Sequence, residues 1–398
     1  MRSLLLALLL LASNASAQSI HQSEYEKQQR TFETSSAAPH TQRPQRLVSN
    51  EYPLHSYGFH PYWAADSLAD SYRWDLLNTL AYFGAEIDPL TGEILATNRY
   101  YSTAVIPTAL ANGVAVHLTA ILFSKHDSLL LYPSRRVKAI IELLGMVNDR
   151  GIDGINIDFE AVPGRLRDSL TAFVRELRAA GGPSIEIVID IPAVDWNNAF
   201  DVASIGPLVD RFFLMAYDYH WRTGPTAGPV APLNSAGLSI MNSLSRYDLK
   251  GIDRSKLILG LPWYGYDWPT ASTEKEATTL AGGTAVTTAY AMQQSAIYGR
   301  RYDQQAQSPS YTYQFDQTIH QVWYDDAVSL AAKYKFALDE DLAGIGYWAM
   351  SYAAHIPEMW DAVGSALRSS SGIVRASDPM LNIPVTASNV ACFDLLGR

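Results

Sequence analysis

Apolar runs of strand length recur along the chain from about residue 51 onward, and stretches with helical periodicity separate several of them. Eight of these runs have the β-branched and aromatic composition that is typical of strands. They cover residues 55–63, 78–87, 113–121, 154–159, 184–192, 211–219, 256–265 and 344–352. Strands that alternate with helices indicate βαβ units and therefore a parallel sheet.

Two of the intervening stretches predict helices clearly. Residues 134–149 carry an apolar stripe with a period of 3.6 residues, which Ser134 can cap at its start and which Gly151 follows at its end. Residues 165–180 carry a second stripe. The first consists of Val137, Ile140, Ile141, Leu144 and Val147, and the second of Leu166, Leu170, Phe173, Val174 and Leu177.

Eight strands joined by helices favour a (β/α)8 TIM barrel, an α/β fold, over residues 51–366. The structural alternative is a doubly wound open sheet, which would carry a Gly-rich phosphate turn after its first strand. No such turn follows residues 55–63, and Gly344 and Gly346 lie inside a strand pattern with no helix opening behind them. The barrel is therefore the expected fold.

A long gap separates the seventh and eighth predicted strands. Its first part, about residues 266–321, is rich in Thr, Ser, Gln and Tyr. A structureless loop of this length is improbable inside a compact domain. We therefore expect a small α+β insertion at the mouth of the barrel.

The N-terminal region has the pattern of an export signal. Arg2 precedes the apolar run Leu4–Leu11, and small residues close the segment at Ala15–Ala17. This pattern predicts a secretory signal peptide over residues 1–17. Residues 18–50 are polar with little periodicity, and we expect them to form a flexible leader.

The C-terminal region, residues 367–398, reads as a linker followed by a fragment of another domain. Its last part, NIPVTASNVACFDLLGR at 382–398, is similar to the beginning of the C-terminal sorting domain of Bacteroidetes-type secretion. It stops at Arg398, where such domains continue, so the fragment is expected to be truncated. Together with the signal peptide, this predicts a secreted protein that is periplasmic, at the cell surface or extracellular.

The charge and the cysteine content indicate which kinds of protein this chain can be. The formal net charge is −10 and the isoelectric point is about 5.4, which argues against nucleic-acid binding. Cys392 is the only cysteine, so no intrachain disulfide can form, and this fits a bacterial exported protein. No stretch after the signal peptide is long and apolar enough for a membrane span. We expect a monomer.

The segment GIDGINIDFE, residues 151–160, carries the clearest chemistry. Side chains in a strand alternate between two faces, so Asn156, Asp158 and Glu160 share one face. The apolar residues between them face the helices, and the polar face points into the barrel. Two carboxylates close together in a buried site cannot both ionise easily, which predicts a raised pKa for Glu160. A carboxylic acid that keeps its proton near neutral pH can act as a general acid.

Two other interpretations of this cluster remain open. A metal site of Asp and Glu is possible, although the strand offers no histidine in phase with the carboxylates. A purely structural polar cluster is the second. Asp153 is out of phase with the others, and His117 on the third strand is expected to be a core histidine.

Several motifs together resemble glycoside hydrolase family 18, the chitinase family. DGINIDFE, residues 153–160, resembles the family signature DGxDxDxE, and MAYD, residues 215–218, resembles its M-x-Y-D. Trp348 matches the tryptophan at the floor of the sugar pocket. The segments 261–268 and 320–326 are similar to the di-N-acetylchitobiase branch and to related bacterial exported enzymes. The resemblance covers about residues 55–365 and also implies a TIM barrel.

The resemblance implies a retaining cleavage of β-1,4 bonds that follow N-acetylglucosamine, with the substrate's own acetamide as nucleophile. Glu160 would be the general acid and base, Asp158 would hold the acetamide N–H, and Tyr217 would donate to its carbonyl oxygen. Substrate-binding roles are implied for Asn156, Asp218, Trp348, Met215 and Trp263. Trp263 and Tyr264 are aromatics that could contact sugar, and packing in the core is an equally open interpretation for each. No metal or cofactor is implied.

Asn156 stands where the family signature usually has an aspartate. It cannot carry charge, and we expect it to donate a hydrogen bond to Asp158 and to orient that carboxylate. Chitin or chito-oligosaccharides are the first expected substrate class, peptidoglycan strands the second, and the core of N-linked glycans the third. The rival interpretation is a catalytically silent sugar-binding protein on the same barrel.

Overall fold

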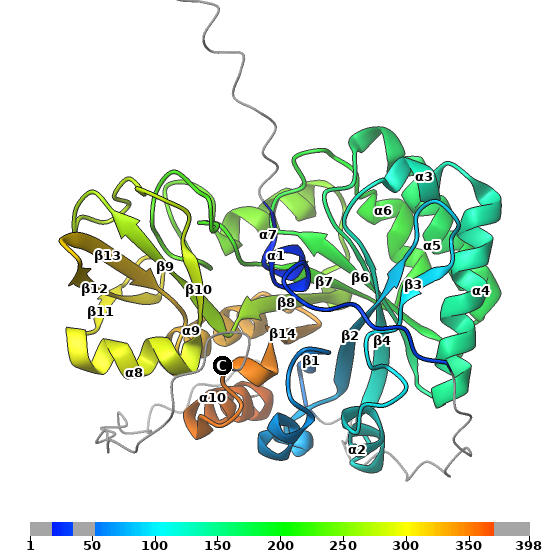
Figure 1. Ribbon diagram of the computed structural model, residues 1–398, viewed down its shortest axis with the longest axis horizontal. Helices are drawn as coiled ribbons and strands as arrows, with labels where there is room; N and C mark the ends of the chain where they lie inside the picture. Colours follow the sequence, from blue (N-terminus) through cyan, green and yellow to red (C-terminus); the bar gives the residue numbers. More distant parts are fainter. Residues whose placement is uncertain (1–17, 35–51, 370–398) are drawn as a thin grey trace, which may run out of the picture.

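The computed structural model describes residues 18–34 and 52–369, and it is built around a closed barrel of eight parallel strands (Figure 1). All eight predicted strands are present, within a few residues of the expected bounds. They are β1 (His55–Pro61), β2 (Thr79–Ile87), β4 (Ala115–Leu122), β5 (Gly154–Phe159), β6 (Glu186–Pro192), β7 (Arg211–Met215), β8 (Leu257–Pro262) and β14 (Gly344–Trp348). The predicted TIM barrel is therefore confirmed.

The barrel closes through its first strand. Neighbouring strands follow the order β1-β14-β8-β7-β6-β5-β4-β2, and β1 also pairs with β2. Tyr57, for example, lies opposite Gly346 on one side and Thr79 on the other. A short strand, β3 (Ile94–Ala96), adds antiparallel to β2. Because all eight barrel strands run the same way, their carboxyl ends meet at one mouth, where barrel enzymes place their chemistry.

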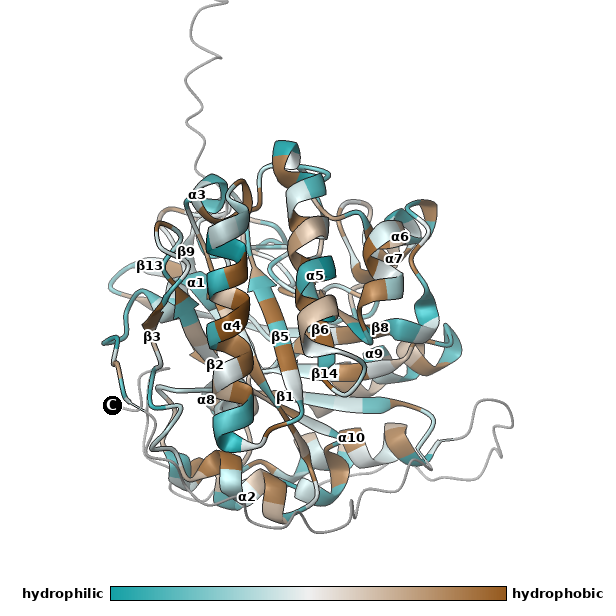
Figure 2. Cartoon of the chain, turned by 90° about the vertical axis from the view of Figure 1, so that its right-hand side faces the viewer, coloured by the Kyte–Doolittle hydropathy of each residue, from teal (hydrophilic) through white to brown (hydrophobic). Residues whose placement is uncertain are grey.

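Helices surround the barrel, and Figure 2 shows α4 and α5 beside each other in front of β5. The α-helices of the barrel are α2 (Val105–Ala111), α3 (His126–Leu130), α4 (Pro133–Arg150), α5 (Arg167–Gly181), α6 (Val202–Ile205), α7 (Ile240–Leu249), α9 (Ala327–Asp339) and α10 (Pro357–Arg368). Short 3-10 helices lie at Asp66–Ser71, Trp74–Leu76, Gly164–Leu166, Gly206–Leu208, Arg254–Lys256 and Met350–Tyr352.

The two predicted apolar stripes differ in how well they match the buried faces of α4 and α5. In α5 the predicted positions are buried. In α4 the buried face is instead centred on Ala139, Leu143 and Met146, while Val137 and Ile141 are exposed. The helix also begins one residue earlier, with Pro133 in its first turn and no side-chain cap from Ser134. Of the predicted stripe, Ile140 and Val147 are buried and Leu144 is partly buried, so the prediction for α4 was wrong at Val137 and Ile141.

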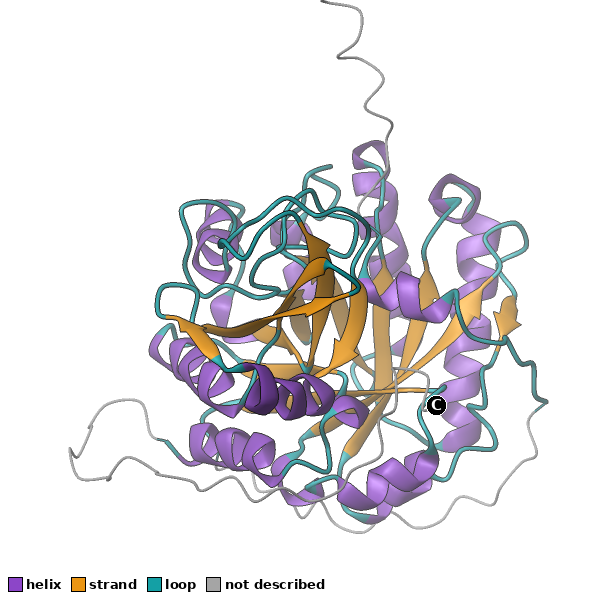
Figure 3. Cartoon of the chain, turned by 60° about the vertical axis from the view of Figure 1, so that its left-hand side comes forward, coloured by secondary structure: helices purple, strands orange, loops and turns teal. Residues whose placement is uncertain are grey.

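The predicted insertion between strands seven and eight is a separate antiparallel sheet with one helix (Figure 3). Its elements are β9 (Tyr264–Thr270), β10 (Thr284–Thr287), α8 (Thr288–Tyr298), β11 (Arg301–Asp303), β12 (Ser308–Phe315) and β13 (Thr318–Trp323). The strand order is β10-β9-β13-β12-β11. Since β9 begins two residues after β8 ends, this sheet stands directly at the mouth of the barrel.

The first part of the predicted leader is folded. Residues 18–34 form helix α1 (Ile20–Tyr25) and an extended stretch after it. Figure 1 shows α1, in dark blue, over the strands of the barrel. Ser19 caps the helix, since its hydroxyl accepts the backbone N–H of Gln22 at 3.0 Å. The prediction of a flexible leader is therefore wrong for residues 18–34.

The other terminal predictions fall outside the described residues. These are the signal peptide over 1–17, the rest of the leader at 35–50 and the sorting-domain fragment at 370–398. The expected linker begins slightly too early, because α10 continues to Arg368. Within the described ranges, no helix has both the length and the apolar character to cross a membrane.

Candidate active site

Strand β5 sets the polar face of the site. Asn156 and Asp158 are fully buried inside the barrel, and Glu160 follows directly after the last strand residue, 8% exposed. Ile155, Ile157 and Phe159 are buried on the opposite face. The strand is held on both sides, by β4 and by β6. The alternation in the sequence therefore becomes one apolar face and one polar face at the carboxyl end of the barrel.

Asn156 does not bond to Asp158 as expected. Its Nδ2 donates to Oδ1 of Asp190 on β6 at 2.7 Å. The prediction that Asn156 orients Asp158 directly was wrong, because an acidic residue on the neighbouring strand lies within reach. Sequence reasoning missed Asp190. Its signal is a lone carboxylate in the apolar run SIEIVIDIP, where a buried acid requires a partner.

His21 of α1 enters the site from the N-terminal side of the chain and is fully buried there. Its Nδ1 lies 2.9 Å from Oδ2 of Asp158 and 3.3 Å from Oε1 of Glu160. Its Nε2 lies 2.7 Å from the hydroxyl of Tyr217. The imidazole thus joins three predicted catalytic side chains that come from β5 and from the segment after β7.

An aromatic wall forms the other side of the site. The ring of His21 lies against the indole of Trp348, with 3.7 Å between ring centroids and 33° between ring planes. Phe83 and Phe59 pack on the same indole at 4.9 and 5.3 Å. Trp348 is itself fully buried at the end of β14. The structure therefore places Trp348 opposite the carboxylates, with the width of one flat ring between them.

Burial and the repulsion between neighbouring acids raise the pKa values of two carboxyl groups in the site. Burial raises the pKa of Glu160, and the neighbouring Asp158 raises it further, while the His21 ring opposes the change. Burial also raises the pKa of Asp190 well above its usual range, with Asp158 adding to the effect. The direction agrees with the prediction for Glu160. Both pKa shifts have the same direction, because burial beside another acid disfavours the charged form of a carboxyl.

For His21, in contrast, the surroundings stabilise the charged form of the side chain. Burial by itself would lower the pKa of His21, but the charges and hydrogen bonds of Asp158 and Glu160 outweigh it and raise the pKa to about 10. The imidazole is therefore a cation at neutral pH, and both of its nitrogens are donors. In that state Nδ1–H points at the carboxylates and Nε2–H at the Tyr217 oxygen.

Asp218 lies at the rim of the same cluster. Its carboxylate accepts the hydroxyls of Tyr264 at 2.5 Å and Tyr266 at 3.1 Å, and the backbone N–H of Ile20 at 3.0 Å. Burial raises the pKa of Asp218 to about 6 against these hydrogen bonds. Tyr264, at the start of β9, therefore reaches the site by way of Asp218.

A family model describes this combination of barrel and carboxylates. The model for glycosyl hydrolases family 18 matches residues 123–353, more than half of the chain. The chain belongs to glycosyl hydrolase family 18. It is a member of a family of glycosidases, and the matched range contains β5, the segment after β7, the insertion and Trp348.

Three similar proteins carry different enzyme names. YdhD of Bacillus subtilis is 31% identical over 227 residues, which are 55% of this chain and 52% of that protein. Di-N-acetylchitobiase of Rattus norvegicus is 26% identical over 306 residues, 70% of this chain and 77% of that protein. The cortical fragment-lytic enzyme of Bacillus subtilis is 28% identical over 226 residues, 53% and 48%. The chain thus spans about half the length of two of these relatives.

Solved structures support the fold. The family 18 chitinase of Cycas revoluta in complex with (GlcNAc)3 superposes with a TM-score of 0.69 at 20% identity. The match covers 78% of this chain and 99% of that one. At this level of identity the likeness shows the barrel architecture that the two chains share.

Not every residue that the family resemblance suggested joins the site. Trp263 is fully buried outside it, with its indole N–H donating to the hydroxyl of Tyr334 at 3.3 Å and its ring packed on Tyr347 and Trp360. The expectation that Trp263 binds sugar was therefore wrong. It sits between β8 and β9, where strand alternation does not indicate a face. Met215 ends β7 and is buried.

The carboxylates and His21 also form a possible set of metal ligands. His21, Asp158 and Glu160 each offer one ligand atom, and these atoms lie within 4.8 Å of one another. The histidine that the strand pattern lacked thus comes from the N-terminal segment. In the described structure its Nδ1 is at hydrogen-bonding distance from both carboxylates, so the three groups pair with one another.

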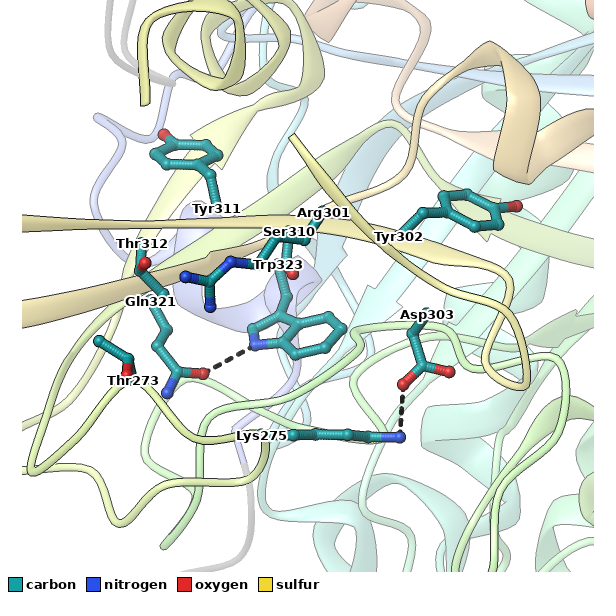
Figure 4. Close-up of a pocket in the computed structure, with 10 residues that line it drawn as sticks. All are labelled: Thr273, Lys275, Arg301, Tyr302, Asp303, Ser310, Tyr311, Thr312, Gln321 and Trp323. Carbon is teal, nitrogen blue, oxygen red and sulfur yellow. Dashed lines mark hydrogen bonds and ion pairs between the residues drawn. The ribbon is translucent and has the colours of Figure 1, made fainter. Parts of the chain in front are cut away.

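A second hollow lies in the family 18 insertion, away from the catalytic set. Figure 4 shows its lining, which includes Lys275, Arg301, Asp303, Gln321 and Trp323. Lys275 pairs with Asp303 at 2.6 Å, and the indole of Trp323 donates to Gln321 at 3.1 Å. Two pairs of the lining side chains are therefore engaged with each other.

Proposed function

We propose that the chain is a retaining glycoside hydrolase that cleaves β-1,4 bonds after N-acetylglucosamine and uses the acetamide of the substrate as nucleophile. One observation carries the proposal: a single five-membered ring, that of His21, touches Asp158, Tyr217 and Trp348 and also comes within 3.3 Å of Glu160. These four side chains therefore converge on a space of the size of one ring.

In the proposed reaction, Glu160 gives its proton to the oxygen of the leaving sugar. The acetamide oxygen attacks the anomeric carbon as this bond breaks, and a cyclic oxazolinium ion forms. Water then attacks the anomeric carbon, Glu160 takes back a proton, and the ring reopens to the acetamide. The raised pKa of Glu160 suits the first step, because the acid must still hold its proton near neutral pH.

The remaining residues position and stabilise. Asp158 accepts the acetamide N–H and faces the positive charge of the intermediate. Tyr217 donates its hydroxyl to the acetamide oxygen, and Trp348 forms the floor under the sugar. Asp218 and Asn156 are proposed to hold this arrangement, Asp218 at the rim with Tyr264 and Asn156 through Asp190.

Chitin and chito-oligosaccharides are the proposed substrate class, supported by the di-N-acetylchitobiase relatives, which align over 70% of the chain. Peptidoglycan is the second candidate, because relatives named cortical fragment-lytic enzymes align over 56% and 53% of the chain. We further propose that the protein is exported, on the strength of the signal-peptide pattern at residues 1–17.

The test compares the protein with a Glu160→Gln variant on chitobiose and chitotriose glycosides and on peptidoglycan. Both are assayed as they are and with His21→Ala added, so that occupancy of the site by His21 does not hide the reaction. Hydrolysis should fall by roughly 10²–10⁴ with Glu160→Gln. Equal null rates in all four proteins on every substrate, with chitotriose still bound, would instead indicate a sugar-binding protein.

A further inference from the structure

The proposed active site is filled by the chain itself. We propose that residues 18–34, called here the N-terminal segment, act as an intramolecular inhibitor that occupies the sugar-binding position, with the His21 ring in place of the substrate's acetamide. The inference rests on the proposed function for the identity of the site. It concerns regulation, which the family match does not address.

The first argument is exclusion. Oδ2 of Asp158 and the hydroxyl of Tyr217 are the groups assigned to the acetamide, and both are engaged by His21 at 2.9 and 2.7 Å. The His21 ring lies against Trp348 at a centroid distance of 3.7 Å in a tilted contact, so it covers the indole. A sugar cannot contact any of these three groups until the ring leaves.

The second argument is chemical likeness. The intermediate of an acetamide-assisted reaction is a flat, five-membered, positively charged ring. The His21 imidazolium is also flat, five-membered and positive, and its charge faces Asp158 and Glu160. A site built to stabilise the first ring also stabilises the second. One contact differs, since the imidazolium donates to the Tyr217 oxygen, whereas an oxazolinium oxygen would accept from it.

The third argument is that the segment is anchored on both sides of His21. Before it, the N–H of Ile20 donates to Asp218 at 3.0 Å. After it, the buried Tyr25 donates its hydroxyl to Glu86 at 2.5 Å, and Arg30 pairs with the same carboxylate at 2.7 Å. These contacts hold the His21 ring in one place, as a tethered ligand would be held.

The extended part of the segment is fastened to the loop after β3. The carbonyl oxygen of Thr31 accepts the N–H groups of Thr97 and Asn98, both at 2.9 Å. Glu33 accepts the hydroxyl of Ser102 at 2.5 Å and the N–H of Tyr101 at 3.0 Å. This attachment lies away from the carboxylates, so the helix can leave the site while the attachment remains.

The segment can also leave without unfolding the barrel. In the described ranges, Thr31 alone makes backbone-to-backbone hydrogen bonds between the segment and the rest of the chain, and the segment adds no strand to the barrel sheet. Its remaining anchors each involve a side chain on at least one side, and Lys27 and Arg30 are about half exposed. The barrel ladder is complete without it, because β1 pairs with both β14 and β2.

The test uses the full chain with His21→Ala and, as a matched control, Gln22→Ala. Gln22 is the next residue of α1, and its side chain bonds Glu26 within the segment rather than the barrel. An intramolecular competitor reduces apparent affinity by the fraction of open sites. His21→Ala should therefore lower KM at least about tenfold with kcat unchanged, and Gln22→Ala should match the wild type. An unchanged or raised KM in His21→Ala would overturn the proposal.

A binding experiment separates this proposal from the proposed hydrolysis. In the Glu160→Gln background, calorimetry measures chitotriose affinity with and without His21→Ala. A gain of at least about tenfold supports the inhibitor even if no variant hydrolyses any substrate. Hydrolysis that depends on Glu160, with no gain in affinity from His21→Ala, overturns the inhibitor and leaves the enzyme.

Hydrogen–deuterium exchange gives a readout that needs no substitution at His21. Saturating chitotriose added to the Glu160→Gln protein should increase exchange at the amides of residues 22–26, because the sugar displaces α1. The amides of α9 serve as the internal control and should not change. Unchanged or slower exchange in residues 22–26 at saturation would overturn the proposal.

Discussion

The side-chain amide of Asn156 donates a hydrogen bond to the carboxylate of Asp190, with 2.7 Å between Nδ2 and Oδ1. Both residues are buried within the barrel, on adjacent strands. Asp190 is in turn raised in pKa by burial and by the charge of Asp158. The amide of Asn156 therefore acts on the reacting carboxylates through Asp190. An aspartate at this position would add one more acid to a site that already holds three.

Changing Asn156 to Asp should move the pH dependence of kcat/KM more than it lowers the maximum. A fourth buried acid beside Asp158, Glu160 and Asp190 disfavours further ionisation, so Glu160 should hold its proton to higher pH. The basic limb of the profile is expected to shift upward by about one pH unit. Asn234→Asp, which adds the same charge at an exposed position, is the control. A profile identical to the wild type would show that the amide only fills space.

Changing Tyr217 to Phe should lower kcat by about 10²-fold, because a hydrogen-bond donor to the reacting oxygen is lost. Tyr219→Phe is a matched control two residues away, where the hydroxyl contacts Ser243 at 2.7 Å outside the site. That control should lose stability, by about 1 kcal/mol, and keep kcat. If both variants lost kcat equally, the Tyr217 hydroxyl would have a structural role only. Steady-state kinetics and urea unfolding of the two proteins decide this.

The anomer of the first product tests the acetamide as nucleophile. Two inversions at the anomeric carbon give net retention, so the product released from a β-linked substrate should be the β-anomer. Proton NMR on freshly mixed enzyme and chito-oligosaccharide separates the two anomers before they equilibrate. The His21→Ala protein should give the same anomer, since His21 takes no part in the reaction. An early α-anomer would contradict the mechanism.

The barrel and the reacting face of β5 can be predicted from sequence because their signals are local. Strand alternation fixes which side Asn156, Asp158 and Glu160 share, and the eight apolar runs fix the fold. The partner of Asn156 cannot be found in this way, since Asp190 is brought near by sheet register alone.

The N-terminal segment is the clearest failure of local reasoning. Its sequence SIHQSEYEKQQR is polar, and polarity usually indicates a flexible region. It folds because His21 enters a site made by residues more than a hundred positions away, including Asp158 and Tyr217, and Tyr25 bonds to Glu86, 61 positions away. Two features of this sequence indicate a helix: a serine that can cap its start, and a histidine and a tyrosine spaced by one helical turn.

Asp218 should make stability fall as pH rises. Its pKa of about 6 in the folded protein lies above the usual value of 3.8, so its contribution is complete below about pH 3.8 and is lost as pH rises through about 6. Unfolding free energies of wild type and Asp218→Asn, measured from about pH 4 to 7, should change by at most about 3 kcal/mol relative to each other. Asp70→Asn, at an exposed position, is the control. A constant difference for Asp218→Asn would contradict the assignment.

The ion pair between Lys333 and Asp325 should dominate the stability of the region where the insertion returns to the barrel. Both side chains are fully buried, and Ser329 also donates to the Asp325 carboxylate at 2.7 Å. Lys333→Met leaves Asp325 buried without its cation, which typically costs about 3–5 kcal/mol. Lys335→Met, two residues further along α9, breaks an exposed pair with Asp339 and should cost less than about 1 kcal/mol.

Because Asp325 already has a pKa raised to about 6 by burial, the Lys333→Met protein should recover part of its stability as pH falls and this carboxyl takes a proton. Urea unfolding of both variants at neutral and acidic pH measures the two effects, and equal losses for Lys333→Met and Lys335→Met at neutral pH would show that the buried pair adds nothing beyond an exposed one.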